Sequence, residues 1–182
     1  TTAFVVAASS GAMAREIERG SIFLLLSRPV PRLHMMAAKL GSMMVGLVVF
    51  QVFILLGTWI GATVYDLAGM DYRAILLIMV NGFFLGMAVA GVTFPISAVS
   101  SDGGRAIALS AGLLVVLFFV DFLAGTWSAV EAIGPVSPFH YYDPVGVVGT
   151  ASVPVLHLGV LAAFAVGGLA LAAVAFSLRD IP

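Results

Sequence analysis

Four long apolar segments dominate the pattern of this chain, and short stretches between them hold most of its charged residues. The segments run about Ala37 to Val64, Ala74 to Val99, Ile107 to Trp127 and Val155 to Leu178. A helix needs about 20 apolar residues to cross a hydrocarbon layer of about 30 Å, and each segment is long enough. The pattern predicts an all-α, polytopic integral membrane helical bundle, one transmembrane domain over residues 1–182 with four full spanning helices.

Composition agrees with a membrane location and excludes several other classes of protein. Of the 182 residues 62% are hydrophobic and 9% charged, and the mean hydropathy is +1.16. Soluble domains of ordinary composition do not reach such values. The net charge of −1 and the absence of basic tracts interleaved with aromatics argue against nucleic acid as a partner. The chain has no cysteine, so it holds no disulfide and no thiolate metal site.

The first fourteen residues form a shorter apolar stretch, Thr1 to Ala14, which is rich in small side chains. It is too short to span the bilayer alone, so we expect it to be the last part of a spanning helix. A segment lying on the bilayer surface is the alternative. Because the chain starts at Thr1 without methionine or a signal-peptide pattern, we expect that an N-terminal portion is missing.

Residues 15–36 combine charge, turns and a short amphipathic surface, and we expect them to form an elbow along the membrane. Gly20 suits the end of one helix and Ser21 the cap of the next. The sequence Arg28-Pro29 then ends the helical turn, because the residue before proline is pushed away from helical angles. Arg28 and Arg32 would reach lipid phosphates. The alternative is an interfacial helix that only anchors the chain.

The basic residues predict the orientation. If the elbow is cytoplasmic, one basic residue, Arg73, lies outside, and seven lie on the cytoplasmic side: Arg15, Arg19, Arg28, Arg32, Lys39, Arg105 and Arg179. Cytoplasmic flanks of membrane proteins carry such an excess of Lys and Arg. The elbow and the C-terminus are therefore expected in the cytoplasm.

Two connections are predicted to be tight turns, Asp66 to Arg73 outside and Ser100 to Arg105 inside, whereas the third, residues 128–154, is long. It has too many prolines to span and is too apolar for a solvated loop. We expect a re-entrant or lid-like piece packed on the outer mouth, since open backbone facing lipid is not tolerated. The proposed lid residues are Pro138, Phe139, Tyr141, Tyr142 and Pro144.

Three polar side chains inside the apolar segments are candidates for a transport pathway: Gln51, Asn81 and Asp121. An intramembrane carboxylate is a functional candidate by default. Asp121 could instead be solvated from the outer side, and Gln51 and Asn81 could be interhelical hydrogen-bond partners.

Small residues recur at four-residue spacing, for example Gly82 and Gly86, or Gly159, Ala163 and Gly167, and this spacing predicts close helix packing.

No catalytic or metal-binding constellation is recognisable. His34, His140 and His157 are far apart in the sequence and lack the spacing of a metal site. The phosphate-binding pattern GxxxxGK[ST] does not occur, so we expect no cofactor in this chain and no enzymatic activity of its own. Energy from a nucleotide would have to enter through another protein.

The order of residues in the elbow resembles the cytoplasmic coupling segment of ABC-transporter permeases of the exporter class. There, an acidic residue and Gly-Thr precede an apolar turn, a proline, an arginine and a lysine. Here Ser21 stands where threonine is commoner, and Pro31 where a small polar residue is usual. The matching positions are Glu16, Gly20, Ser21, Leu25-Leu26-Ser27-Arg28-Pro29, Arg32 and Lys39. The closing Phe176-Ser177-Leu178-Arg179-Asp180 and the outer Ser-Pro-Phe-His-Tyr-Tyr-Asp-Pro are also similar to that family.

The resemblance implies a six-helix membrane subunit that lacks about its first one and a half helices here. Its partners would be a separate ATP-binding subunit, which holds ATP and Mg²⁺, a second permease copy in a homo- or heterodimer, and the lipid of a bacterial inner membrane. The coupling residues would be Glu16, Glu18, Arg19, Gly20, Ser21, Arg28, Pro29, Arg32 and Lys39. With no large outer domain, we expect a small amphiphilic, drug-like or lipid substrate.

Two alternatives remain at this stage. The first is an ion-coupled secondary transporter with Asp121, alone or together with Asn81, as its ion or proton site, although one carboxylate and no visible inverted repeat weaken it. The second is a non-transporting membrane scaffold that relays an ATPase cycle to the outside. A substrate-flux assay would distinguish both from an exporter.

Overall fold

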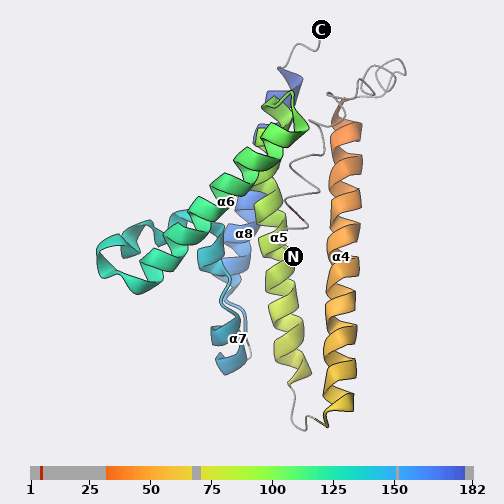
Figure 1. The fold of residues 1–182 in the computed structure, drawn as a ribbon, viewed down its shortest axis with the longest axis vertical. Coiled ribbons are helices and arrows are strands. Elements are labelled where there is room, and N and C mark those ends of the chain that lie inside the picture. The colour runs from red at the N-terminus through yellow and green to blue at the C-terminus, as the bar shows by residue number, and fades with distance from the viewer. Residues whose placement is uncertain (1–4, 6–31, 67–70, 151, 179–182) are drawn as a thin grey trace.

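The computed structural model describes residue 5 and residues 32–66, 71–150 and 152–178 (Figure 1). The described part is almost entirely helical and contains no strand. Seven helices follow one another: α4 (Arg32–Val64), α5 (Tyr72–Val99), α6 (Gly103–Thr126), the 3-10 helices η1 (Ser128–Val136) and η2 (Pro138–Tyr141), α7 (Pro144–Thr150) and α8 (Val155–Ser177). The prediction of an all-α membrane bundle is confirmed.

Four of these helices are long and apolar enough to cross a membrane. The apolar spans are Ala37–Val64, Tyr72–Val99, Gly103–Thr126 and Val155–Ala175, of 28, 28, 24 and 21 residues. Each exceeds the roughly 20 residues that a bilayer requires. The spans run alternately in opposite directions, so α5 and α8 point the same way (Figure 1).

Two spanning helices begin earlier than the apolar pattern predicted, because an aspartate caps each of them. The Asp71 carboxylate accepts hydrogen bonds from the backbone N–H groups of Arg73 at 2.9 Å and Ala74 at 3.2 Å, so α5 begins at Tyr72. Asp102 accepts from the N–H of Arg105 at 2.9 Å. The inner turn is therefore shorter than the predicted Ser100 to Arg105, and α6 includes Gly103 to Arg105.

The core of the described part lies between α5 and α8, which pack along one another. Phe94 and Val89 on α5 and Leu161 on α8 are fully buried. At one point the two backbones touch: a Cβ atom added to Gly91 would meet the carbonyl oxygen of Phe164 and lie 2.8 Å from Ala165 Cα. A Cβ on Gly168 would meet the carbonyl of Gly91. Only glycine fits on both sides of this crossing.

This crossing corrects the predicted packing seam on the last helix. Gly159 and Gly167, two of the three small residues expected to face a neighbour, have open space where a Cβ would stand. The contact uses Gly168 instead, one position further along the helix. On α5, Gly86 does face a neighbour, because an added Cβ would lie 3.1 Å from Leu47 of α4.

The helices α4 and α6 share much less surface with this core. α4 runs beside α5 (Figure 1), and its Leu47 is buried against Gly86 of α5, whereas Phe53 on α4 is 69% exposed. α6 leans away from α5, and its Phe119 and Phe122 are exposed (Figure 1). The described part therefore presents broad apolar faces on these two helices.

Candidate functional site

The residues predicted to couple to an ATPase lie mostly outside the described part of the chain. This applies to Glu16, Glu18, Arg19, Gly20, Ser21, Arg28 and Pro29, and to the predicted partial spanning helix 1–14 except for Val5, which is buried. The last two, Arg32 and Lys39, lie in the first turns of α4. This helix begins inside the predicted elbow, because Arg32-Leu33-His34-Met35-Met36 continues the helix rather than ending a turn.

The three candidate pathway residues make separate contacts. Gln51 on α4 donates from Nε2 to the backbone carbonyl of Met79 on α5 at 2.7 Å, an interhelical hydrogen bond. Asp121 on α6 lies 3.2 Å from Nδ1 of His140. Asn81 on α5 is 1% exposed and lines a pocket that contains neither of the other two.

Residues 128–154, here called the cap, hold η1, η2 and α7, and they fold back onto the spanning helices. η1 packs along α6, where a Cβ on Gly134 would lie 2.9 Å from Ala124 Cβ. Phe139 of η2 meets Phe118 of α6 edge to face, with 5.8 Å between ring centroids. These contacts hold the cap against α6.

Four of the five proposed lid residues pack within the cap or against the core: Pro138, Phe139, Tyr141 and Tyr142. Pro138 is fully buried, and Tyr141 donates from its hydroxyl to the Pro135 carbonyl at 3.1 Å. A Cβ on Gly82 of α5 would lie 3.7 Å from the Tyr142 ring. Pro144 begins α7. Their role as a lid stays a prediction.

A row of three rings crosses the base of the cap. The Tyr141 ring stands edge to face between two imidazoles, with centroid distances of 5.3 Å to His140 and 5.5 Å to His157. The sequence placed these two histidines on unrelated elements. The fold joins them through Tyr141, and so connects Asp121 on α6 with the beginning of α8.

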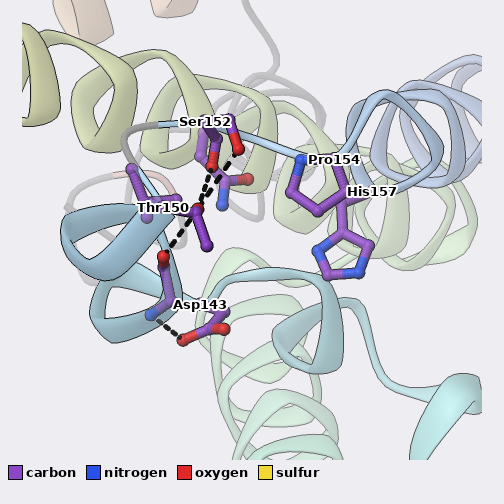
Figure 2. Close-up of a pocket in the computed structure, with 8 residues that line it drawn as sticks. Asp143, Thr150, Ser152, Pro154 and His157 are labelled. Atoms are coloured by element: carbon purple, nitrogen blue, oxygen red, sulfur yellow. Dashed lines mark hydrogen bonds between the residues drawn. The ribbon is translucent and has the colours of Figure 1, made fainter.

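Next to this row lies a pocket of about 120 Å³ between α5, α7 and the start of α8. Figure 2 shows Thr150 and Ser152 hydrogen-bonded on one side, with His157 across from them. Asp143, at the start of α7, accepts a hydrogen bond at Oδ1 from the N–H of Gly146 at 2.8 Å. The pocket is partly open to the surface, and most of its lining surface is apolar, although five of its eight lining residues have polar side chains.

Two atoms of the pocket residues are buried and have no hydrogen-bond partner among the residues that the structure describes: Oδ1 of Asn81 and Nδ1 of His157. Buried polar atoms are paired in the great majority of cases, so an orphaned pair in one pocket marks a candidate binding site. Sequence reasoning identified Asn81 but missed Asp143 and His157. The signal available for His157 was an ionisable residue within an apolar span.

The comparison with protein families decides what kind of protein carries this pocket. A family model described as ABC-2 family transporter protein matches residues 2–181. The chain belongs to the ABC-2 transporter family. It is a multi-pass membrane protein and an ABC transporter permease, as the elbow sequence predicted. No curated protein and no solved structure gives a significant match.

The described residues of this permease form no recognisable metal-binding site. They contain no group of three or more His, Cys, Asp or Glu side chains placed to hold a metal ion. The pocket brings together one imidazole and one carboxylate, His157 and Asp143. A small polar ligand is therefore a better match to the pocket than a transition metal, which takes more ligands of this kind.

We expect the folded permease to lose stability at high pH, because the Tyr142 phenol is buried. Burial raises the pKa of this phenol above its ordinary value of 10.0. Above pH 10 the unfolded chain therefore loses the proton before the folded chain does, and stability falls as the pH rises toward the folded pKa. Tyr142→Phe should flatten this decline in thermal unfolding between about pH 9 and pH 11.

Tyr65→Phe is the control, because Tyr65 is 77% exposed and lies outside the cap, after the end of α4. It should leave the alkaline decline unchanged. An identical decline in Tyr142→Phe and the parent protein would contradict the assignment to Tyr142.

Proposed function

We propose that this permease is the membrane subunit of an ATP-driven exporter and moves a small amphiphilic, drug-like or lipid substrate. The family match over residues 2–181 is the main support, since ABC-2 permeases typically work with an ATP-binding subunit. The sequence has no phosphate-binding loop of its own, so ATP and Mg²⁺ would bind to that partner. Two permeases and two ATPase subunits would form the unit.

The elbow, residues 15–36, is the proposed contact with the ATPase. It holds four of the eight basic residues of the chain and two of its nine acidic ones, next to a glycine and two prolines that fix turns. A partner can shift a membrane protein between two states only through contacts that differ between them. Charged side chains on a stiff elbow supply such contacts, and α4, which continues from the elbow, leads from it to the opposite end of the bundle.

The orientation that this proposal requires is supported by the distribution of basic residues. Arg105 lies in the first turn of α6, at the same end of the bundle as the start of α4, whereas Arg73 lies in the first turn of α5, at the other end. The proposal places the elbow and the C-terminus in the cytoplasm of a bacterial cell, and the cap outside, as the positive-inside rule favours.

The contacts of Asp121 and Asn81 favour an ATP-driven exporter over an ion-coupled carrier. The Asp121 carboxylate faces His140 at the base of the cap, and its side chain is 27% exposed. Asn81, which a carrier could use with it, lines the neighbouring pocket instead. An ion site needs its ligands to converge, and these two do not form one pocket.

The test is a variant that changes charge and shape in the elbow. Glu18→Lys combined with Gly20→Leu should abolish the substrate-dependent part of ATP hydrolysis by the assembled transporter, and transport with it, while membrane insertion stays normal. Transport and hydrolysis would be measured in proteoliposomes, and insertion by membrane fractionation.

A matched double variant at the other end of the bundle, Gly125→Leu with Glu131→Lys, serves as control. Both positions are exposed, and a Cβ on Gly125 would meet nothing within 4 Å. This control should keep coupled hydrolysis within about twofold of the parent protein, because surface changes away from structural features have small effects. If the elbow variant keeps the substrate-dependent ATP hydrolysis of the parent protein, the proposed role of the elbow is wrong.

A further inference from the structure

The pocket between α5, α7 and α8 presents hydrogen-bond acceptors that nothing in the described chain satisfies. Oδ1 of Asn81 is a buried acceptor without a partner. Nδ1 of His157 is also buried and unpaired, and it accepts a hydrogen bond when the imidazole proton is on Nε2. Leaving a buried acceptor unpaired is unfavourable, so a ligand that donates to both would be bound with a gain.

The third acceptor is the Asp143 carboxylate, which adds a negative charge. One of its oxygens accepts from the N–H of Gly146, which holds the carboxylate at the edge of the pocket. Among the residues that the structure describes, no Lys, Arg or His lies within ion-pair distance of Asp143. The charge of this carboxylate is therefore available to a ligand.

We propose that this pocket binds the primary ammonium group of a small amine. An ammonium group of the R–NH₃⁺ type has three N–H donors and no acceptor. Asn81, His157 and Asp143 supply three acceptors, one of them charged, and hydrogen bonds between charged groups are roughly twice as strong as neutral ones. The volume of about 120 Å³ is well above the roughly 10–15 Å³ that one water molecule requires on the same kind of measure, so the pocket has room for an aminoethyl group.

Other ligand classes fit this pocket less well. An anion would be repelled by Asp143, and no Lys or Arg side chain lines the pocket to hold it. A trimethylammonium group carries the same charge but no N–H, so it would leave the acceptors of Asn81 and His157 unpaired. The pocket should therefore discriminate between primary and quaternary amines.

Two sources of a primary ammonium group can reach the pocket. One is a soluble amine, and the other is the head group of an aminophospholipid, because the pocket is partly open and lies toward the end of α5 that carries the cap. Binding from either source is independent of ATP, so this inference goes beyond the proposed export and stands or falls separately from it.

The experiment is a titration of the complete permease in phosphatidylcholine nanodiscs, without ATP, followed by calorimetry. Ethanolamine should bind, and choline should bind at least about tenfold more weakly, which corresponds to losing one good hydrogen bond to a charge. Asp143→Asn should weaken ethanolamine binding at least about tenfold. Because Asn keeps a carbonyl oxygen for the Gly146 N–H, this variant preserves the start of α7.

Glu131→Gln is the matched control, since Glu131 is an exposed acid of the cap that does not line the pocket. It should bind ethanolamine as the parent protein does. Repeating the titration in nanodiscs with phosphatidylethanolamine separates the two sources: loss of ethanolamine binding there assigns the pocket to the lipid head group, and unchanged binding assigns it to a soluble amine. The proposal is overturned if ethanolamine does not bind, if choline binds equally well, or if Asp143→Asn binds like the parent protein.

Discussion

Gly168→Ala is expected to separate α5 from α8 and to destabilise the permease by about 3 kcal/mol. The added Cβ would meet the carbonyl of Gly91 and lie 2.7 Å from its Cα atom. These are backbone atoms of another helix, so no side chain can turn aside to make room. The two helices must move apart along the best-packed contact in the described part of the bundle.

The neighbouring Gly167→Ala is a matched control for this change. It makes the same substitution one position earlier in α8, where an added Cβ meets nothing within 4 Å. Its stability should stay equal or rise slightly, because alanine favours a helix over glycine by up to about 1 kcal/mol. Unfolding of both variants would be followed by denaturant titration in mixed micelles, and equal midpoints would contradict the close crossing.

Phe94→Ala should also destabilise the protein strongly, by about 3 kcal/mol. Phe94 is the largest of the fully buried side chains described, and it fills the core beside α8. In a membrane, lipid is as apolar as the protein interior, so the loss comes mainly from the cavity and the missing packing contacts.

Phe53→Ala removes the same side chain from a position on α4 that is 69% exposed. It leaves no cavity, so its unfolding midpoint should remain close to that of the parent protein. A similar loss for Phe53→Ala and Phe94→Ala would show that aromatic content, rather than burial in the core, sets the stability.

The spanning helices could be predicted from the sequence because a bilayer imposes one requirement on all of them. Each needs a run of about 20 apolar residues with its backbone hydrogen-bonded internally. That requirement fixes the number of spans but not where each helix begins. Asp71 and Asp102 set two of the starts, and both lie outside the apolar runs on which the prediction rested.

The packing between helices was less predictable, because a one-residue error turns a helix by about 100°. The spacing of small residues pointed to Gly159, Ala163 and Gly167, and the observed crossing uses Gly168. Small residues occur on several sides of α8, so their spacing alone does not identify the face that meets α5.

The candidate pocket could be predicted only in part. Asn81 was recognisable as an amide inside an apolar span. Asp143 and His157 come from the cap and from the start of α8, and only the folding of the cap onto α5 brings them to Asn81. The sequence contains no regular spacing among these three residues, so no motif could have joined them.

The contact between Gly91 and Gly168 limits how the two helices can rearrange. Backbone already touches backbone there, so the distance between the two helix axes is at its lower limit and cannot shorten further. No side chain lies between them whose rotation could open a second arrangement. A conformational cycle that keeps this contact must either move α5 and α8 together as one body or change the angle between them, so that the ends of the pair swing while their crossing point stays in place.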